Sequence, residues 1–227
     1  MRKSKVMMVG DVHGDWASLN TLITKKKPDI ILQCGDFGWW PTFSRIKSTL
    51  YREKEWSHTG VKPQETTIYW CDGNHEDHSD LSKHKEITEL YKGINYCPRG
   101  STITLPDNRV VLFIGGAESI DRRWRTIGVD WFAEELINNN DLDKCLVHDK
   151  VDIVISHTCP FEFHVITKSI DKYNDPSQKA LSIVLDKYKP DQWFFGHFHK
   201  NQIGKRNNTY WECLDYPRNG NKWWRWL

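Results

Sequence analysis

Three apolar runs in the first third of the chain each end close to a glycine, which is typical of buried strands that run into tight turns. A stretch whose apolar residues recur at helical spacing, from Trp16 to Ile23, separates the first run from the second and stops at Pro28. Strand, helix and strand repeated in this way predict parallel βαβ units, so we expect an α/β fold. The three runs are residues 5–9, 30–34 and 67–71.

The middle of the chain has a different pattern. Short strand-like runs are separated there by turn residues such as Pro98, Gly100 and Asn108, so antiparallel hairpins are expected. Further along, Asp175 and Pro176 are placed as the N-cap and first residue of a helix that ends before Pro190. The other helices are predicted over residues 43–56, 130–138 and 142–149, and the other strands over 94–96, 101–105, 109–114, 152–156, 192–195 and 209–213.

The composition of the chain argues against several classes of protein. The 227 residues carry a formal net charge of +2, which argues against a nucleic-acid binder that relies on a broad basic surface. No apolar run approaches the roughly 18 residues of a membrane span, and the apolar stretch after the basic N-terminus is too short for a signal peptide. Six cysteines without a CxxC pair favour free buried thiols over a thiolate zinc site. A cytoplasmic protein with no membrane segment is therefore expected.

Polar residues that could carry chemistry follow the predicted strands in five blocks. In an α/β sheet, ligands bind at the carboxyl ends of the strands. Asp11 and His13 are two residues apart, as are His197 and His199, so on an extended backbone the members of each pair point the same way. The blocks are Gly10-Asp11-Val12-His13-Gly14, Gly35-Asp36, Gly73-Asn74-His75-Glu76, Ser156-His157 and Gly196-His197-Phe198-His199.

The residue types in these blocks indicate a metal site. Carboxylate, imidazole and carboxamide groups without a thiolate suit a divalent ion such as Mn²⁺, Fe or Zn²⁺. Each block alone has an ordinary explanation, because Gly-Asp is common in turns and a single loop histidine is more often solvated than bound to metal. Five blocks, each placed after a predicted strand, are hard to assign to chance.

The order of the blocks resembles the calcineurin-like metallophosphoesterase family, whose pattern is DxH, GD, GNH[E/D], H and GHxH. The match spans residues 10–199, and every metal-binding position has the expected residue type. The resemblance implies a four-layer α/β/β/α sandwich, in which two mixed β-sheets are flanked by helices and a dimetal site lies at the carboxyl ends of the strands. We expect residues 1–227 to form this single domain, with the Trp-rich tail 217–227 packed on it.

The resemblance also implies the ligands of two divalent metal ions, with Asp36 as the carboxylate that bridges them. A water held between two such ions would lose a proton near neutral pH, and this metal-bridging hydroxide would attack phosphorus in line. Mn²⁺ is the favoured metal, with Fe, Zn²⁺ and Ni²⁺ as alternatives. One ion would be held by Asp11, His13 and His199, and the other by Asn74, His157 and His197.

The catalytic group implied by the resemblance consists of Asp36, Asn74 and His75. In the family, the position of His75 lies near the leaving-group oxygen, where a histidine serves as a general acid or a donor to phosphate. A purely supporting role for His75 is the other interpretation. Three acidic residues are candidates for orienting its ring: Asp72, Glu76 and Asp77.

Substrate-binding residues are less clearly marked. The second block lacks the phosphate-binding arginine of the phosphoprotein-phosphatase branch, which reads GDxVDRG. Segment 115–125 combines two glycines, a serine and three arginines, and arginine binds phosphate with two parallel hydrogen bonds, so Arg122 and Arg125 are the favoured candidates. A solvated surface loop is an equal alternative for this segment. Trp39 is a candidate wall of the substrate cleft, although packing in the core is slightly favoured for it.

Together these features predict a metal-dependent phosphoesterase. A phosphomonoesterase that acts on a small molecule or nucleotide is favoured, because no long basic groove is evident. The alternative is a nucleotide phosphodiesterase or nuclease that stacks bases on its tryptophans, which keeps nucleic acid as a candidate partner. A catalytically silent scaffold is less favoured, because all seven ligand positions are filled. The sequence gives no indication of the oligomeric state.

Overall fold

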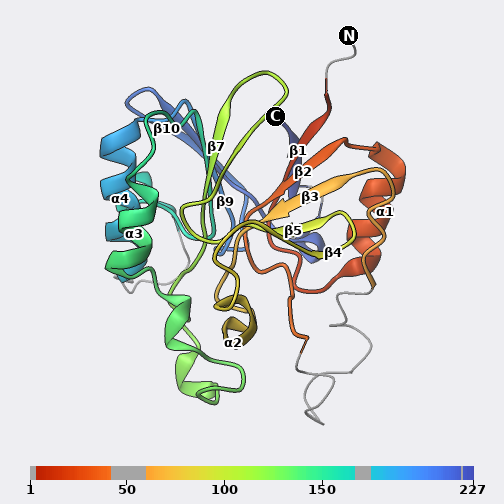
Figure 1. Ribbon diagram of the computed structural model, residues 1–227, viewed down its shortest axis with the longest axis horizontal. Coiled ribbons are helices and arrows are strands. Elements are labelled where there is room, and N and C mark those ends of the chain that lie inside the picture. The colour runs from red at the N-terminus through yellow and green to blue at the C-terminus, as the bar shows by residue number, and fades with distance from the viewer. Residues whose placement is uncertain (1–3, 42–59, 167–174, 221) are drawn as a thin grey trace.

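Two six-stranded sheets pack against each other at the centre of the molecule, and helices cover their outer faces (Figure 1). The computed structural model describes residues 4–41, 60–166, 175–220 and 222–227. Within this part of the chain, helix α1 (Trp16–Lys26) covers the first sheet, whereas α3 (Asn139–Cys145) and α4 (Pro176–Tyr188) cover the second. The expected α/β/β/α sandwich is thereby confirmed.

The two sheets are mixed in the same way. Each has four parallel strands at its centre and one antiparallel strand at each edge. The first sheet has the order β12 (Trp224–Trp226), β1 (Val6–Val9), β2 (Ile30–Gln33), β3 (Thr67–Trp70), β5 (Ile94–Tyr96), β4 (Thr88–Tyr91). The second has the order β10 (Gln202–Arg206), β11 (Thr209–Cys213), β9 (Gln192–Phe195), β8 (Ile153–Ser156), β7 (Val110–Ile114), β6 (Thr102–Thr104).

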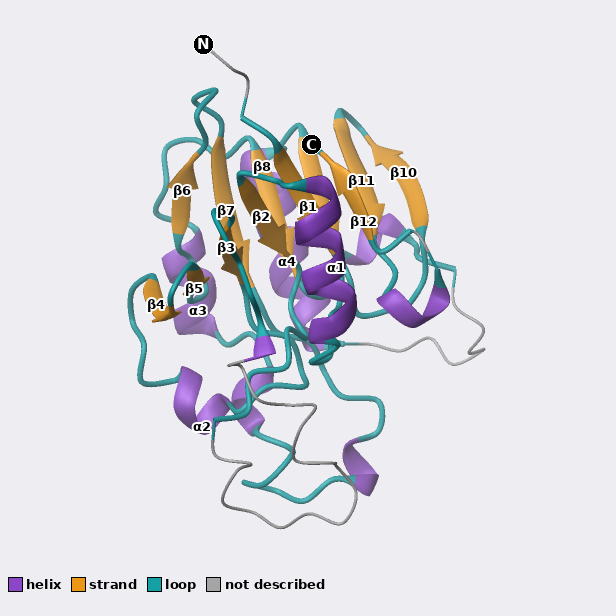
Figure 2. Ribbon diagram, turned by 90° about the vertical axis from the view of Figure 1, so that its right-hand side faces the viewer, coloured by secondary structure: helices purple, strands orange, loops and turns teal. Residues whose placement is uncertain are grey.

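The register of the parallel strands brings their carboxyl ends to one edge. Val9 of β1 lies opposite Gln33 of β2, which in turn lies opposite Trp70 of β3. In the second sheet, Ile155 of β8 is paired with Phe194 of β9. Because these strands end in step, the loops that follow them gather at one end of the two sheets (Figure 2).

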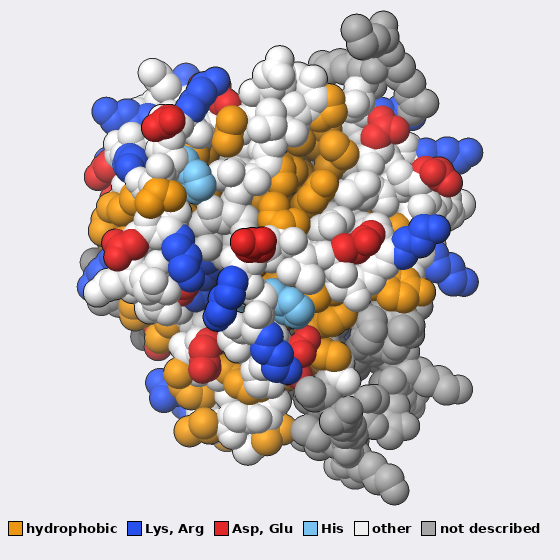
Figure 3. Space-filling view, viewed as in Figure 1, with side chains coloured by type: hydrophobic (Ala, Val, Ile, Leu, Met, Phe, Trp, Pro, Cys, Tyr) orange, Lys and Arg blue, Asp and Glu red, His pale blue; other side chains and the backbone are white. Residues whose placement is uncertain are grey.

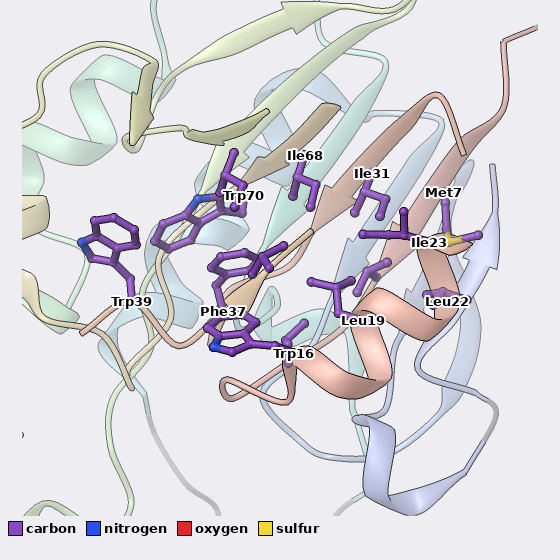
Figure 4. Close-up of a cluster of buried hydrophobic side chains, with 14 of the residues drawn as sticks. Met7, Trp16, Leu19, Leu22, Ile23, Ile31, Phe37, Trp39, Ile68 and Trp70 are labelled. Atoms are coloured by element: carbon purple, nitrogen blue, oxygen red, sulfur yellow. The ribbon is translucent and has the colours of Figure 1, made fainter. Parts of the chain in front are cut away.

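Three buried clusters account for the four layers. Alternation along β1 divides its side chains between two of them: Met7 and Val9 face the cluster under α1, and Met8 faces the cluster between the sheets. The cluster under α1 is rich in aromatic rings, among them Trp70, which Figure 4 places beside Phe37. The third cluster lies between the second sheet and helices α3 and α4.

Local sequence signals explain where the two long helices begin and end. Asp15 caps α1 by accepting a hydrogen bond from the backbone N–H of Ser18, and the helix ends at Lys27 in a left-handed conformation. Asp175 caps α4 in the same way, and Pro176 occupies its first turn, as predicted.

The helix predicted over 130–138 is wrong: only a short 3₁₀ turn, Ala133–Glu135, forms there. The backbone carbonyls of Glu134, Glu135 and Leu136 accept hydrogen bonds from the Arg99 guanidinium, so they are not available to an α-helical ladder. The helix predicted over 142–149 is shifted, because the capping box of Asn138 and Asp141 starts α3 earlier. The helix predicted over 43–56 lies outside the described residues.

Several elements were not predicted from the sequence, namely the edge strands β4 and β10 and the short helix α2 (His78–Leu81). In the Trp-rich tail, which was expected to pack on the domain, β12 pairs with β1. All six cysteines are free and buried, as expected. No helix among the described residues is both long enough and apolar enough to span a membrane.

Candidate metal centre

The site is built by loops whose backbone adopts an uncommon conformation. His13, Asp36, His197 and His199 all have positive φ, between 46° and 65°. Non-glycine residues adopt this left-handed region at a cost, and such strain is often found at functional sites. Each of these residues follows a strand, so the strained turn is what directs its side chain toward the space between the two sheet ends.

Two glycines permit the close packing of these loops. A Cβ atom at Gly196 would lie 1.9 Å from the Asp11 Oδ1 atom, and one at Gly73 would lie 2.1 Å from the Asp36 Oδ1 atom. Any side chain would therefore displace a carboxylate. The glycines that precede His197 and Asn74 are thus required by the approach of neighbouring loops.

The first group of candidate ligands consists of Asp11, His13, Asp36 and His199. One ligand atom from each lies within 4.8 Å of all the others. The Nε2 atoms of His13 and His199 are 2.8 Å apart, and that of His199 is 3.1 Å from the Asp11 Oδ2 atom. Asp11 is fully buried, whereas the side chain of His199 is 41% exposed, so this group opens to solvent on the histidine side.

The second group consists of Asn74, His157 and His197. The Asn74 Oδ1 atom lies 2.9 Å from the Nε2 atom of His157 and 3.1 Å from the Nδ1 atom of His197. Asp36 connects the two groups, because its Oδ2 atom is 3.6 Å from the Nε2 atom of His13 and 3.4 Å from that of His157. All seven predicted ligands are therefore brought together.

The donor set fits a pair of divalent cations. The Nδ1 atom of His157 donates to the backbone carbonyl of Cys34, so its Nε2 atom faces the Asp36 carboxylate and the Asn74 carboxamide. Burial alone would lower the pKa of His157, but Asp36 and Asp11 outweigh this effect and raise it to about 10. The cluster thus favours positive charge at this position, and two carboxylates, four imidazoles and a carboxamide are ligands that Mn²⁺, Fe and Zn²⁺ accept.

His75 lies beside this cluster. Its backbone N–H donates to the Asp36 Oδ1 atom at 2.8 Å, and its ring packs edge-on against that of His13, with centroids 5.2 Å apart. The Arg125 Nη2 atom contacts both ring nitrogens, at 2.6 and 3.0 Å. Burial, together with the Arg125 charge, lowers the pKa of His75 to about 4, so its ring is neutral near pH 7.

Both the sequence and the structure are similar to those of known proteins. A model of the family described as calcineurin-like phosphoesterase matches residues 4–201. The chain belongs to the calcineurin-like phosphoesterase family. Its members are metal-dependent phosphoesterases, and the family implies a dinuclear divalent metal site. No match was found among curated protein sequences.

Solved structures share the fold of this phosphoesterase at low sequence identity. The protein TT1561 of Thermus thermophilus superposes with a TM-score of 0.57 at 11% identity, covering 95% of this chain and 90% of the other. The phosphopantetheinyl hydrolase PptH from Mycobacterium tuberculosis superposes with a TM-score of 0.51 at 12% identity, covering 99% and 96%. At these identities the likeness concerns the fold.

The predicted substrate residues of the phosphoesterase are not all placed together. The guanidinium of Arg125 lies at the site, where it also donates to the backbone carbonyl of Asn74 and pairs with Asp121. The guanidinium of Arg122 instead lies over the ring of Trp131, 4.0 Å from its centroid. Trp39 is only 4% exposed, belongs to the cluster under α1 and donates to Asp80, so it is part of the core rather than the wall of a cleft.

The structure also brings to the site residues that sequence reasoning missed. The ring of Tyr216 packs against that of His199, with centroids 4.4 Å apart and ring planes tilted by 31°. Ser119 accepts a hydrogen bond from the carboxamide of Asn74 and donates one to Glu135. Ser119 belongs to the arginine-bearing segment that the sequence singled out, but no signal marks Tyr216 or Glu135, because their roles depend on contacts distant in the chain.

The acidic neighbours of His75 have other partners. Asp72 forms an ion pair with Arg99, and Glu76 accepts hydrogen bonds from the backbone N–H groups of Gly38 and Gly73. Burial and the nearby Asp36 raise the pKa of Glu76 to about 8. None of these bonds involves the His75 ring. The two ring nitrogens are contacted instead by the guanidinium of Arg125.

Proposed function

We propose that this phosphoesterase is a cytoplasmic, Mn²⁺-dependent phosphomonoesterase in which residues 1–227 act as one catalytic domain. The observation that supports the proposal best is the adjacency of the seven-ligand cluster to a buried guanidinium and a neutral imidazole. A terminal phosphoryl group has three oxygens for such a set of donors. Free, buried thiols on all six cysteines agree with a reducing compartment.

Each residue near the cluster can be given a role on this proposal. Divalent ions bound there supply an activated water and neutralise charge on the phosphoryl oxygens. Asp36 and Asn74 hold the two halves of the cluster together, since the first faces both groups and the second faces two histidines. Arg125 binds a phosphoryl oxygen, and the N–H of His75 donates to the leaving-group oxygen.

The distribution of charge supports a small substrate. On the face shown in Figure 3, basic and acidic side chains are interspersed, and no continuous basic band crosses its described part. A nuclease that follows a phosphate backbone uses such a band. A small anionic ester needs only the metal ions and one or two arginines.

Turnover of matched esters tests the proposal. We expect metal-depleted protein to be inactive and Mn²⁺ to restore hydrolysis of p-nitrophenyl phosphate, with kcat/KM at least about 10-fold above that for bis(p-nitrophenyl) phosphate, a difference of about 1.4 kcal/mol in transition-state binding. The reverse order, or cleavage of single-stranded DNA, would establish the diesterase or nuclease alternative. Failure to hydrolyse any phosphate ester with Mn²⁺, Fe, Zn²⁺ or Ni²⁺ would refute the proposal.

Replacing His75 with alanine should lower kcat by about 10²-fold or more, the usual loss when one positioned hydrogen-bond donor of an active site is removed. The loss should be larger for phenyl phosphate than for p-nitrophenyl phosphate, because the poorer leaving group depends more on a hydrogen bond to its oxygen. His84→Ala is the matched control, since His84 packs near Tyr96, away from the ligands. Equal losses on both substrates would contradict a role at the leaving group.

Replacing Arg125 with alanine should raise KM for p-nitrophenyl phosphate by about 10-fold or more, because a charge-assisted hydrogen bond to phosphate contributes about 1.5–3 kcal/mol. Arg123→Ala is the control, because Arg123 is exposed and lies over the ring of Trp124. Steady-state kinetics at saturating Mn²⁺ would measure both. An unchanged KM in the Arg125 variant would exclude this guanidinium from substrate binding.

A further inference from the structure

A buried chain of hydrogen bonds connects Asn74 to a glutamate outside the metal cluster. The Asn74 Nδ2 atom donates to the Ser119 Oγ atom at 3.1 Å, and Ser119 Oγ in turn donates to the Glu135 Oε2 atom at 2.6 Å. Glu135 is fully buried, and the exposed fractions of Ser119 and Asn74 are only 3% and 5%. The chain is therefore shielded from water, which could otherwise substitute for any of its members.

The direction of every bond in this chain is determined at the Glu135 end. Its Oε1 atom accepts from the backbone N–H of Ser119 at 2.7 Å and from the Trp131 indole N–H at 2.9 Å, and neither group can act as an acceptor. The Ser119 hydroxyl therefore finds a carboxylate acceptor at Oε2 and directs its proton there. Its lone pair is left to face Asn74, which can meet it only with the amide NH₂ group.

The hydrogen bond made by the Nδ2 atom determines where the Oδ1 atom of the same carboxamide points. When the Nδ2 atom of Asn74 is held by Ser119, the Oδ1 atom must point toward His157 and His197, as it does at 2.9 and 3.1 Å. The opposite rotamer would direct an NH₂ group at these histidines, and an amide nitrogen is not a metal ligand. Without a fixed partner at Nδ2, the two orientations have similar shape and differ only in their hydrogen bonds.

We propose that Ser119 and Glu135 are positioning residues that fix the orientation of the Asn74 carboxamide, and so complete the second metal half-site. The inference rests on the proposed metal-dependent function of the cluster. It also gives a role to a carboxylate that is fully buried, where its hydrogen-bond donors among the described residues are Ser119 and Trp131. Segment 115–125 therefore orients the Asn74 carboxamide through Ser119, and it also carries Arg125, the residue proposed to bind a phosphoryl oxygen.

Glu135→Gln is the sharpest variant, because it preserves shape and reverses the donor pattern. In one orientation, the oxygen of the new side-chain amide at position 135 faces the two N–H groups and its NH₂ group faces Ser119. The Ser119 hydroxyl then donates to Asn74, and the Asn74 carboxamide turns around. In the other orientation, the new NH₂ group faces two N–H donors.

Two variants of Ser119 and one control complete the set. Ser119→Ala removes the connection to Asn74, and Ser119→Thr retains the hydroxyl. Glu134→Gln is the matched control, since the side chain of Glu134 is exposed.

Titration calorimetry with Mn²⁺ on metal-depleted protein measures the effect directly. For Glu135→Gln and Ser119→Ala we expect one of two Mn²⁺ affinities to fall about 10- to 100-fold, the usual loss when a partner of a metal ligand is removed. Ser119→Thr should recover most of this affinity, and Glu134→Gln should match the wild type. At saturating Mn²⁺, KM for p-nitrophenyl phosphate should stay within about 2-fold of the wild-type value, because the Arg125 side chain is unchanged.

Melting in EDTA separates this role from a general loss of stability. A positioning role predicts weakened Mn²⁺ binding in variants that remain folded, as judged by circular dichroism. Wild-type affinity for both ions in folded Glu135→Gln and Ser119→Ala would overturn the inference. The wild-type protein could bind two Mn²⁺ ions, and the variants could rank in Mn²⁺ affinity as expected, while no phosphate ester is hydrolysed. That result would refute the proposed function and support the positioning role.

Discussion

Asp36→Asn is expected to lower kcat by more than about 10³-fold, which corresponds to more than about 4 kcal/mol of lost transition-state stabilisation. Asp36 faces both halves of the cluster through one oxygen, with the Nε2 atoms of His13 and His157 at 3.6 and 3.4 Å. Two cations about 3.5–4 Å apart repel each other strongly, and a shared carboxylate offsets that repulsion. A neutral carboxamide cannot do so, and we therefore expect both metal ions to bind more weakly.

Asparagine is preferred to alanine for this test because it keeps a side-chain oxygen to accept the hydrogen bond from the backbone N–H of His75, which Asp36 accepts at 2.8 Å. Asp186→Asn, on the exposed side of α4, is the matched control. Metal content measured after dialysis and kcat measured with added Mn²⁺ should fall together in the Asp36 variant alone. Full Mn²⁺-dependent turnover by folded Asp36→Asn protein would contradict the assignment of Asp36 as the bridging ligand.

The parts of the fold that could be predicted are those specified by local sequence. The central strands are buried on both faces, so runs such as Val110–Ile114 are apolar throughout and end at glycines. The long helices have their own caps at Asp15 and Asp175. Edge strands such as β10 are half-exposed and polar, with the sequence QIGKR, so they lack the same signal.

The candidate site divides in the same way. Its candidate metal ligands follow strands, where Asp11 and Asp36 could be found from short motifs. The groups that orient them come from distant segments, because Ser119 is 45 residues from Asn74 and Glu135 is a further 16 away. No spacing rule connects such residues, so only the three-dimensional structure reveals them.

Segment 130–138 illustrates why a local pattern can fail. Its residues have helical spacing, but three consecutive carbonyls accept hydrogen bonds from one guanidinium, that of Arg99. The tertiary contact replaces the helical hydrogen bonds and places the Glu135 side chain under Ser119. Arg99 thus holds the backbone of segment 134–136, from which the Glu135 side chain reaches Ser119.

Arg99→Met should reduce the free energy of unfolding by about 3–5 kcal/mol, the usual cost of breaking a buried ion pair by removing one partner. The Arg99 side chain is 8% exposed and donates to Asp72 at 2.6 Å and to Asp141 at 2.9 Å, besides the three carbonyls. Methionine fills the space of the aliphatic stem but leaves both carboxylates without this partner. Lysine should restore only part of the loss, because a point charge cannot reach all of these acceptors.

The difference in the free energy of unfolding between wild type and Arg99→Met should depend on pH, in a direction determined by Asp72. Burial alone would raise the pKa of this carboxyl, but Arg99 outweighs burial and holds it below its usual range. A carboxyl with a depressed pKa in the folded state stabilises the fold above its unfolded pKa of about 3.9, and this contribution is lost as the pH falls through the folded value. The difference between wild type and Arg99→Met should therefore be full at pH 7 and shrink below about pH 4.

Thermal and urea denaturation in EDTA would measure this difference without a contribution from bound metal. For a chain of this length, about 3–5 kcal/mol corresponds to a decrease in Tm of about 6–20 °C. Arg109→Met is the control, because its partner Asp107 is 43% exposed and such a surface pair contributes only about 0–1 kcal/mol. Equal stability of Arg99→Met and Arg109→Met at pH 7 would show that the hydrogen bonds and ion pairs of Arg99 do not hold segment 134–136 against the loop that carries Asn74.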